Sequence, residues 1–290
     1  MKSSIQQAAR SAILVCAITF VFAAVGCTTT TRQVTDTRPV LRNSAPSTMS
    51  ELRIADTALE SGNFDLATSL YEKALQADPK SVPGLTGLGN TLYGVGDYTR
   101  AGVYYQRASQ IEPKATPPLI GIARVAIHQR RFDDAIATYR RVLTLAPNDP
   151  LACAGLGAAL DLSGDHAHAQ ALLREALIAN PGDPMLSVNL GLSLTLGGDP
   201  RQGANVLLDV TRFPAAPPQA RQNLALAYGL LGNDDAAAAI LSRDLPKASV
   251  QDNLRFYELQ RGRDAQTGQP PKSVAVSMVA TPKVQTASVK

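Results

Sequence analysis

The chain has 290 residues, of which 45% are hydrophobic, 18% charged and 5% aromatic, with no Trp. This composition excludes a polytopic membrane protein and a wholly disordered chain, and the few aromatic residues argue against a β-sandwich or barrel. The formal charge is +4 and no run of five or more like charges occurs, so nucleic acid is not expected as a partner. We therefore expect an all-α fold.

The N-terminus has the pattern of an export signal. Lys2 and Arg10 precede an uncharged, mostly apolar run from Ser11 to Val25. The run is shorter than the roughly 20 residues that a membrane-spanning helix needs. It ends in Ala24-Val25-Gly26-Cys27, which polar residues follow at once. Residues 1–26 are therefore predicted to be a signal peptide that is removed.

The residues around Cys27 resemble the lipobox of bacterial lipoproteins, with Ala24 where that family usually has Leu. The resemblance implies that the Cys27 thiol carries diacylglycerol and that a further acyl chain, such as palmitate, modifies its amine. Two or more acyl chains give stable membrane attachment. Because Thr28 stands where an Asp would mark inner-membrane retention, the resemblance favours the outer membrane, facing the periplasm. An ordinary secretory signal with an incidental cysteine is the alternative.

Residues 27–47 are predicted to form the lipidated cysteine and a flexible tether, since they are rich in Thr, Ser and Pro and have no helical period. With Cys16 removed and Cys27 lipidated, only Cys153 would remain in the folded part. An intramolecular disulfide is then impossible, and we expect Cys153 to be a small buried residue.

One set of residues recurs every 34 positions along the following chain, which is the mark of a repeat protein. Each repeat has a large aliphatic residue followed by a small one, a second small residue twelve positions later, and usually a Gly between them. The aliphatic positions are Ile54, Leu88, Ile122, Leu156, Leu190 and Leu224; the Gly positions are Gly62, Gly96, Gly164, Gly198 and Gly232, with Arg130 as the exception; and Pro79, Pro113, Pro147 and Pro181 close the first four units.

This spacing predicts two antiparallel helices in each repeat. The large residue fills the space between the helices, the small residues let their backbones approach, and the Gly lies in the turn. Large side chains four positions after the second small residue share its helix face, and they are Tyr71, Tyr105, Tyr139, Leu173, Leu207 and Leu241. Six helix pairs follow from the pattern.

The pattern resembles the tetratricopeptide repeat over residues 48–251, with departures at Pro200, Asp234 and Ala215. The resemblance implies a right-handed superhelical solenoid. Residues 252–263, with Leu254 and Tyr257, are expected to form a helix that caps its last apolar face. Residues 264–290 are expected to be a disordered tail.

No catalytic, cofactor-binding or metal-binding group of residues emerges from the sequence. The fragments Gly87/Gly89 and Gly155/Gly157 recur at the repeat spacing inside first helices, so packing explains them better than phosphate binding does. His166 and His168 are two positions apart and do not share a helix face. The protein is not expected to be an enzyme.

Binding of a protein segment is the function that the fold implies, because the first helices of such repeats line a concave groove. By the resemblance, the C-terminal half of this groove is apolar with two amides, formed by Met185, Val188, Asn189, Leu192, Leu196, Asn223, Leu226 and Leu230. Asn189 and Asn223 could pair with the backbone of a bound peptide. Alternatively, the Asn residues bridge neighbouring helices and the apolar residues are buried against the capping helix.

Five arginines gather in the third repeat, and most of them fit a solvated convex face. Arg124 is the exception, because its repeat position places it in the groove near His128, where it could meet a carboxylate group.

The combination of lipid anchor, tether and peptide-binding repeats resembles the TadD lipoproteins of Tad (Flp) pilus assembly, as does the segment Asn253-Leu254-Arg255-Phe256-Tyr257. This resemblance implies a pilotin-like scaffold that helps a secretin or another pilus-assembly component to assemble. A type IV pilus pilotin, a β-barrel-assembly lipoprotein and an adaptor for peptidoglycan enzymes are the alternatives. The sequence leaves the client and the oligomeric state open.

Overall fold

The computed structural model describes residues 48–267, which form thirteen α-helices and no strand. The predicted signal peptide, Cys27, the tether up to residue 47 and the chain after residue 267 lie outside the described residues. The helices are α1 (Thr48–Glu60), α2 (Phe64–Ala77), α3 (Val82–Gly94), α4 (Tyr98–Ile111), α5 (Thr116–His128), α6 (Phe132–Leu145), α7 (Pro150–Leu162), α8 (His166–Ala179), α9 (Pro184–Leu196), α10 (Pro200–Thr211), α11 (Pro218–Leu230), α12 (Asp234–Leu241) and α13 (Lys247–Thr267).

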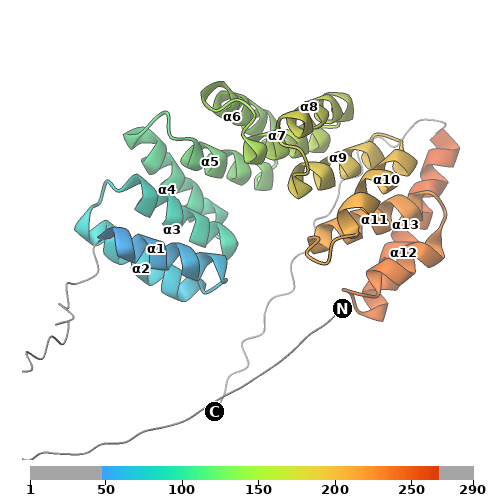
Figure 1. Cartoon of the computed structure of the whole chain (residues 1–290), viewed down its shortest axis with the longest axis horizontal. Coiled ribbons are helices and arrows are strands. Elements are labelled where there is room, and N and C mark those ends of the chain that lie inside the picture. The colour runs from blue at the N-terminus through green and yellow to red at the C-terminus, as the bar shows by residue number, and fades with distance from the viewer. Residues whose placement is uncertain (1–47, 268–290) are drawn as a thin grey trace, which may run out of the picture. The chain divides into compact units, whose positions relative to one another are not determined.

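The helices confirm the predicted all-α solenoid of six helix pairs followed by one more helix. Each helix packs against the next along the chain, and the pairs follow one another in chain order from α1 to α13 (Figure 1). The odd-numbered helices α1 to α11 are the first helices of the repeats, and the even-numbered helices are the second.

Glycine makes the turn inside five of the six pairs, as predicted. Gly62, Gly96, Gly164, Gly198 and Gly232 have φ between 76° and 97°, which is the left-handed region that glycine enters without steric cost. Arg130, the exception in the sequence, adopts the same turn conformation with φ of 58°. The backbone turn is therefore kept even where the glycine is missing.

Short polar side chains begin most of the helices. Ser81, Asp149 and Asp183 accept a hydrogen bond from a backbone N–H in the first turn of α3, α7 and α9, and Asn or Asp does the same for α2, α4, α8, α10 and α12. These caps satisfy amides that the helix itself leaves unpaired.

The core consists of the residues that recur in the sequence. Tyr71, Tyr105, Tyr139, Leu173, Leu207 and Leu241 are all buried. Glycines make room for the rings and leucines, since a Cβ on Gly89 would lie 2.6 Å from a ring carbon of Tyr105. The large residue of one helix therefore occupies the space left by a glycine on another.

The aliphatic position of the first repeat differs from its equivalents. Leu88, Leu156, Leu190 and Leu224 are buried, whereas the side chain of Ile54 is 48% exposed. In the later repeats the preceding helix pair covers this position, and no helix pair precedes α1 among residues 48–267. Cys153 is buried and unpaired, as expected.

The last helix is longer than the sequence indicates. Helix α12 has only 8 residues, and α13 then begins at Lys247 and continues to Thr267, which extends beyond both ends of the predicted cap at 252–263. The side chain of Asp234, which replaces the usual aromatic, pairs with Arg261 of α13 at 2.8 and 2.9 Å. None of the helices in residues 48–267 is both long and apolar enough to span a bilayer.

Candidate functional site

The first helices of the repeats form one continuous face. Each of α1, α3, α5, α7 and α9 packs directly against the next first helix, whereas in the described part of the chain the backbones of the second helices do not approach one another in this way. A side-chain hydrogen bond of 3.0 Å from Arg174 of α8 to Gln202 of α10 joins two of the second helices. The stack is therefore tighter on the side of the first helices. We call this side the concave face.

Two sets of equivalent positions, 34 residues apart, describe how the chemistry of the concave face changes along the repeats. The inner column consists of Asp56, Asn90, Arg124, Ala158, Leu192 and Leu226, and the outer column consists of Glu60, Gly94, His128, Leu162, Leu196 and Leu230. Both columns are acidic in the first repeat, basic or imidazole-bearing in the third and apolar in the last two.

Arg124 lies in an aromatic cluster that three helices contribute. Its guanidinium carbon is 3.9 Å from the centre of the Tyr93 ring, a cation–π contact. The Tyr93 hydroxyl and Nε2 of His128 form a hydrogen bond of 2.6 Å, and the His128 ring stacks on Tyr98 with centroids 4.0 Å apart. Helices α3, α4 and α5 are thus joined beneath the guanidinium.

The electrostatics of this cluster leave Arg124 as its positive charge. Burial and the neighbouring Arg124 lower the pKa of His128, so its imidazole is neutral at pH 7. Burial raises the pKa of the Tyr93 hydroxyl, and Arg124 opposes that shift. Among the described residues, Arg124 forms no ion pair with a carboxylate.

A cleft of about 520 Å³ opens on the concave face beside Arg124. Helices α3 and α5 provide most of its lining, and α1 and α7 contribute one residue each. The residues that offer polar or apolar contacts include Asn90, Tyr93, Ile120, Arg124, Asp149 and Leu151. Leu151 is 47% exposed. The carboxylate of Asp149 already accepts the Ala152 N–H at 2.8 Å, as the cap of α7. The cleft therefore combines one cation, an amide and apolar side chains.

Tyrosines of the second helices reach through to the concave face and orient its polar residues. The Tyr71 hydroxyl donates a hydrogen bond of 2.6 Å to Asp56, and the Tyr105 hydroxyl donates one of 2.8 Å to Asn90. A Cβ on Gly121 would lie 2.5 Å from the Tyr105 ring. Glycine at this position therefore lets the ring reach Asn90.

The apolar residues predicted for the C-terminal half of the groove mostly serve packing. Val188, Leu196 and Leu226 are buried, and the last two share a core cluster with Tyr257 of α13. The predicted groove residues Met185, Leu192 and Leu230 are half-buried and pack against core clusters. For Leu196 and Leu226, with Leu192 and Leu230 beside them, this arrangement corresponds to the alternative in which the capping helix covers them. Val188 and Met185 instead pack in clusters that contain no residue of α13.

The two predicted asparagines are placed differently from each other. Asn189 donates a hydrogen bond of 3.2 Å to the backbone carbonyl of Ala154 in α7, so it bridges two repeats. Asn223 is half-buried in α11. Of the residues predicted for the groove, Arg124 lines the cleft described above and the others do not.

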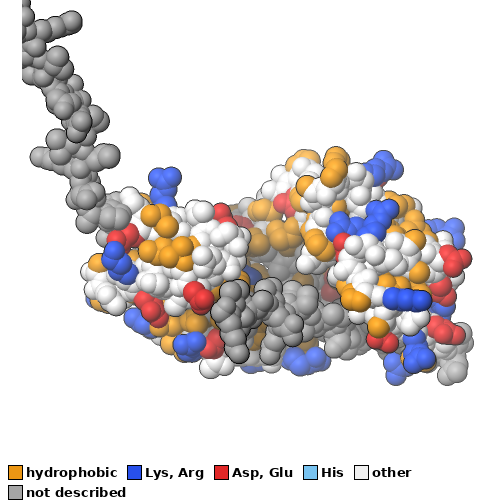
Figure 2. Space-filling view, turned by 90° about the horizontal axis from the view of Figure 1, so that it is seen from below, with side chains coloured by type: hydrophobic (Ala, Val, Ile, Leu, Met, Phe, Trp, Pro, Cys, Tyr) orange, Lys and Arg blue, Asp and Glu red, His pale blue; other side chains and the backbone are white. Residues whose placement is uncertain are grey.

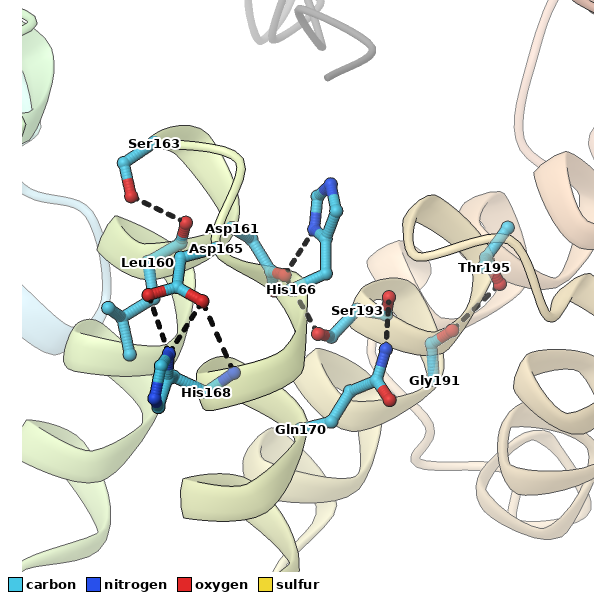
Figure 3. Close-up of polar contacts among 10 residues, drawn as sticks. All are labelled: Leu160, Asp161, Ser163, Asp165, His166, His168, Gln170, Gly191, Ser193 and Thr195. Carbon is cyan, nitrogen blue, oxygen red and sulfur yellow. Dashed lines mark hydrogen bonds and ion pairs between the residues drawn. The ribbon is translucent and has the colours of Figure 1, made fainter. Parts of the chain in front are cut away.

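A second polar cluster, which sequence reasoning missed, joins α7, α8 and α9 (Figure 3). One carboxylate oxygen of Asp161 lies 2.8 Å from Nδ1 of His166 and accepts a hydrogen bond of 2.7 Å from Ser193. Gln170 donates to the backbone carbonyl of Ser193 at 3.2 Å. His166 and Ser193 are 5 and 32 residues from Asp161 in the sequence, so no short motif reveals the cluster.

Ser, His and Asp side chains lie together in this cluster, but their geometry differs from that of a nucleophilic triad. The serine and the histidine bond to the same carboxylate oxygen rather than to each other. Ser193 is fully buried and Asp161 is 7% exposed. The cluster therefore holds three helices together. No group of three or more His, Cys, Asp or Glu residues that could hold a metal ion occurs within residues 48–267.

Comparison with known proteins identifies the repeats. Two family models, both described as tetratricopeptide repeat, match the chain: one matches residues 52–116, and the other matches residues 92–160 and 126–188. No curated protein matches the sequence.

Solved structures share the fold at low sequence identity. A tetratricopeptide repeat protein from Parabacteroides merdae is 12% identical, with a TM-score of 0.62 over 74% of this chain and 86% of that one. PilW, a type IV pilus biogenesis factor, is 18% identical, with a TM-score of 0.61 over 72% and 97% of the two chains. PilF of Pseudomonas aeruginosa is 16% identical, with a TM-score of 0.58 over 72% and 96%.

The helix pairs, the repeat spacing and the family models agree with one another. Residues 52–188 match the tetratricopeptide repeat, and the helices that follow continue the same solenoid.

Proposed function

We propose that the protein is a lipid-anchored scaffold of the outer membrane that binds a segment of a client protein on its concave face and assists assembly of a pilus or secretion apparatus. The cleft beside Arg124 is the observation that carries this proposal. It offers a guanidinium that has no carboxylate partner among the described residues, on an aromatic support and next to an exposed leucine. Such a combination of a few polar groups with apolar walls suits recognition of a protein segment.

The membrane part of the proposal rests on the sequence around Cys27, which resembles a lipobox and lies outside the described residues. A lipid on Cys27 would keep the client at the bilayer while the repeats bind it. The resemblance to TadD lipoproteins favours the Tad (Flp) system, with a secretin or another assembly component as the client.

A type IV pilus is the second candidate, because the fold is similar to that of PilW, a type IV pilus biogenesis factor. The solenoid and the cleft would serve either system in the same way. The two candidates differ only in the client.

Affinity purification from a mild-detergent membrane extract tests the proposal, with mass spectrometry of the proteins that accompany the chain. We expect a secretin or other pilus-assembly proteins, and we expect Cys27→Ala to release the protein from the membrane fraction. Arg124→Glu should lose the client, while Arg107→Glu, an exposed arginine beside Tyr104 on the second helix α4, should retain it. Recovery of only cell-wall enzymes or barrel-assembly proteins would refute the pilus assignment.

A further inference from the structure

After α1, the first helices of the described repeats carry very few charges, and the charges of the concave face are ordered along the stack. Helices α3 and α9 have no Asp, Glu, Lys or Arg, and the one such residue of α7 is the buried Asp161. Arg124 is the one residue of this kind in α5. Within α3, α5, α7 and α9, Arg124 is therefore the one charged side chain that is not buried, and it is positive.

The first helix of the stack has the opposite charge on the same two columns. Asp56 and Glu60 are exposed on α1 at the positions equivalent to Arg124 and His128. Asp56 is held in place by the Tyr71 hydroxyl. Arg53, also on α1, belongs instead to the surface around Ile54 and Leu66 at the N-terminal end of the stack. Along the columns the order is thus acidic, uncharged, positive and then apolar.

This order determines what can cover the concave face. A client that covers Arg124 without supplying a carboxylate would strip water from an unpaired guanidinium, which is costly. A client with a carboxylate at that place gains a charge-assisted hydrogen bond above an ordered aromatic ring. A basic group of the client would be repelled by Arg124 but attracted by Asp56 and Glu60.

Nearby groups do not remove this preference. Burial and Arg124 lower the pKa of His128, which favours its neutral form at pH 7. Asp149, the one acidic residue in the lining of the cleft, accepts the backbone N–H of Ala152 in the first turn of α7 and forms no ion pair with Arg124. On the far side, apolar contacts are available from Leu151 and from the half-buried Leu162 and Leu192.

From this pattern we infer that the client segment has its own ordered chemistry: an apolar part that lies on α7 and α9, then an acidic residue at Arg124, then a basic residue toward Asp56 and Glu60. This inference rests on the proposed function and specifies the partner of the same face. The charge order sets the register and the direction of the bound segment, because the reversed order places like charges together at both ends.

Two labelled peptides of identical composition test the inference on the full chain in detergent. The first has an apolar block, then Glu residues, then Lys residues; the second exchanges the Glu and Lys blocks. Fluorescence anisotropy at pH 7 and moderate salt should show the first peptide binding at least about tenfold more tightly than the second. The preference should weaken as salt is raised.

A charge-reversed variant supplies the matched control. In the double variant Glu60→Lys and Arg124→Glu, both exchanges keep polar side chains on the surface, and the preference should invert in favour of the second peptide. Arg107→Glu on α4 should leave the preference unchanged. Circular dichroism identifies any variant that fails to fold, in which case Arg124→Gln, which should weaken the preference because only Asp56 and Glu60 then distinguish the peptides, replaces the double variant.

Equal affinity for the two peptides, no binding of either, or a preference that the double variant leaves unchanged would each overturn the charge order. These results are separate from failure of the proposed function. If an assembly protein still co-purifies from membrane extracts and is lost with Arg124→Glu, the proposed scaffold function is supported and only the proposed charge order of the client is wrong. If no assembly protein co-purifies, the proposed function itself falls.

Discussion

At the scale of single residues, Asp161 shows how one buried carboxylate joins three helices. It occupies the position that is apolar in the first and third repeats, as Leu59 and Ile127. His166 stands where those repeats have Phe64 and Phe132. A polar pair has therefore replaced an apolar contact, and Ser193 of the next repeat completes it.

Asp161 should make the stability of the protein depend on pH. Burial raises its pKa above the ordinary value of 3.8, against the hydrogen bonds from His166 and Ser193. Since the folded state then holds the proton more tightly than the unfolded state, the free energy of unfolding falls as pH rises from about 3.8 through the raised pKa, by at most about 1.4 kcal/mol per pH unit.

The variant Asp161→Asn should lack this contribution, since an amide does not ionise. Urea denaturation over a series of pH values measures the difference between the two proteins. We expect the native protein to lose stability relative to Asp161→Asn as pH rises through this window. A difference that does not change with pH would contradict a raised pKa of Asp161.

Glycines inside helices differ according to what lies beside them. A Cβ on Gly155 in α7 would overlap the Tyr139 ring, whereas a Cβ on Gly102 in α4 would meet only a methyl carbon of Val125 at 3.5 Å. Gly155→Ala should therefore destabilise the fold by about 1–3 kcal/mol through overpacking. Gly102→Ala should be neutral or stabilising by up to about 1 kcal/mol, because Ala favours the helix. Equal effects of the two variants on the urea midpoint would show that the close approach at Gly155 is unimportant.

At the scale of elements, α13 completes the last repeat rather than standing apart from it. Tyr257 packs with Leu196, Leu226 and Leu241, and a glycine at position 229 makes room for its ring. Arg261 pairs with Asp234 and donates to the backbone carbonyl of Gly229. An apolar contact and an ion pair thus fix α13 on α11 and α12.

Removal of the Tyr257 ring should loosen the C-terminal end of the stack. Tyr257→Ala removes a fully packed aromatic side chain and should cost about 3–5 kcal/mol. The neighbouring Phe256→Ala changes a side chain that is 36% exposed and should cost much less. Because each repeat contacts only its neighbours, hydrogen exchange should speed up in α11 to α13 and stay slow in α3 to α5. Uniform loss of protection along the chain would contradict a locally fixed cap.

At the scale of the whole molecule, the repeat spacing was sufficient to predict the fold. The pattern predicts six helix pairs, because it places Gly in the turns, small residues where two helices touch and large residues in the core. The structure places Tyr71, Tyr105 and Tyr139 in that core. Each repeat contacts only its neighbours. The residues of one repeat are therefore sufficient to predict its own helix pair.

The position of a site residue was predictable from the sequence only where it depends on that residue's own repeat. Arg124 could be placed on the concave face from its repeat position alone. The burial of Leu196 and Leu226 depends on α13, and the Asp161 cluster depends on three helices that no short spacing relates. The exposure of Ile54 likewise depends on which helices lie beside it. The repeat pattern of the sequence does not give this information.

We propose that clients bind on the face formed by the first helices. Site-specific photo-crosslinking in cells tests it most directly, with the photoreactive residue at Leu151 in the cleft or at Ile178 on the second helix α8. Both side chains are exposed, 47% and 81% respectively, so each substitution should be tolerated. We expect a crosslinked client from position 151 and none from position 178. A client captured only from position 178 would contradict it.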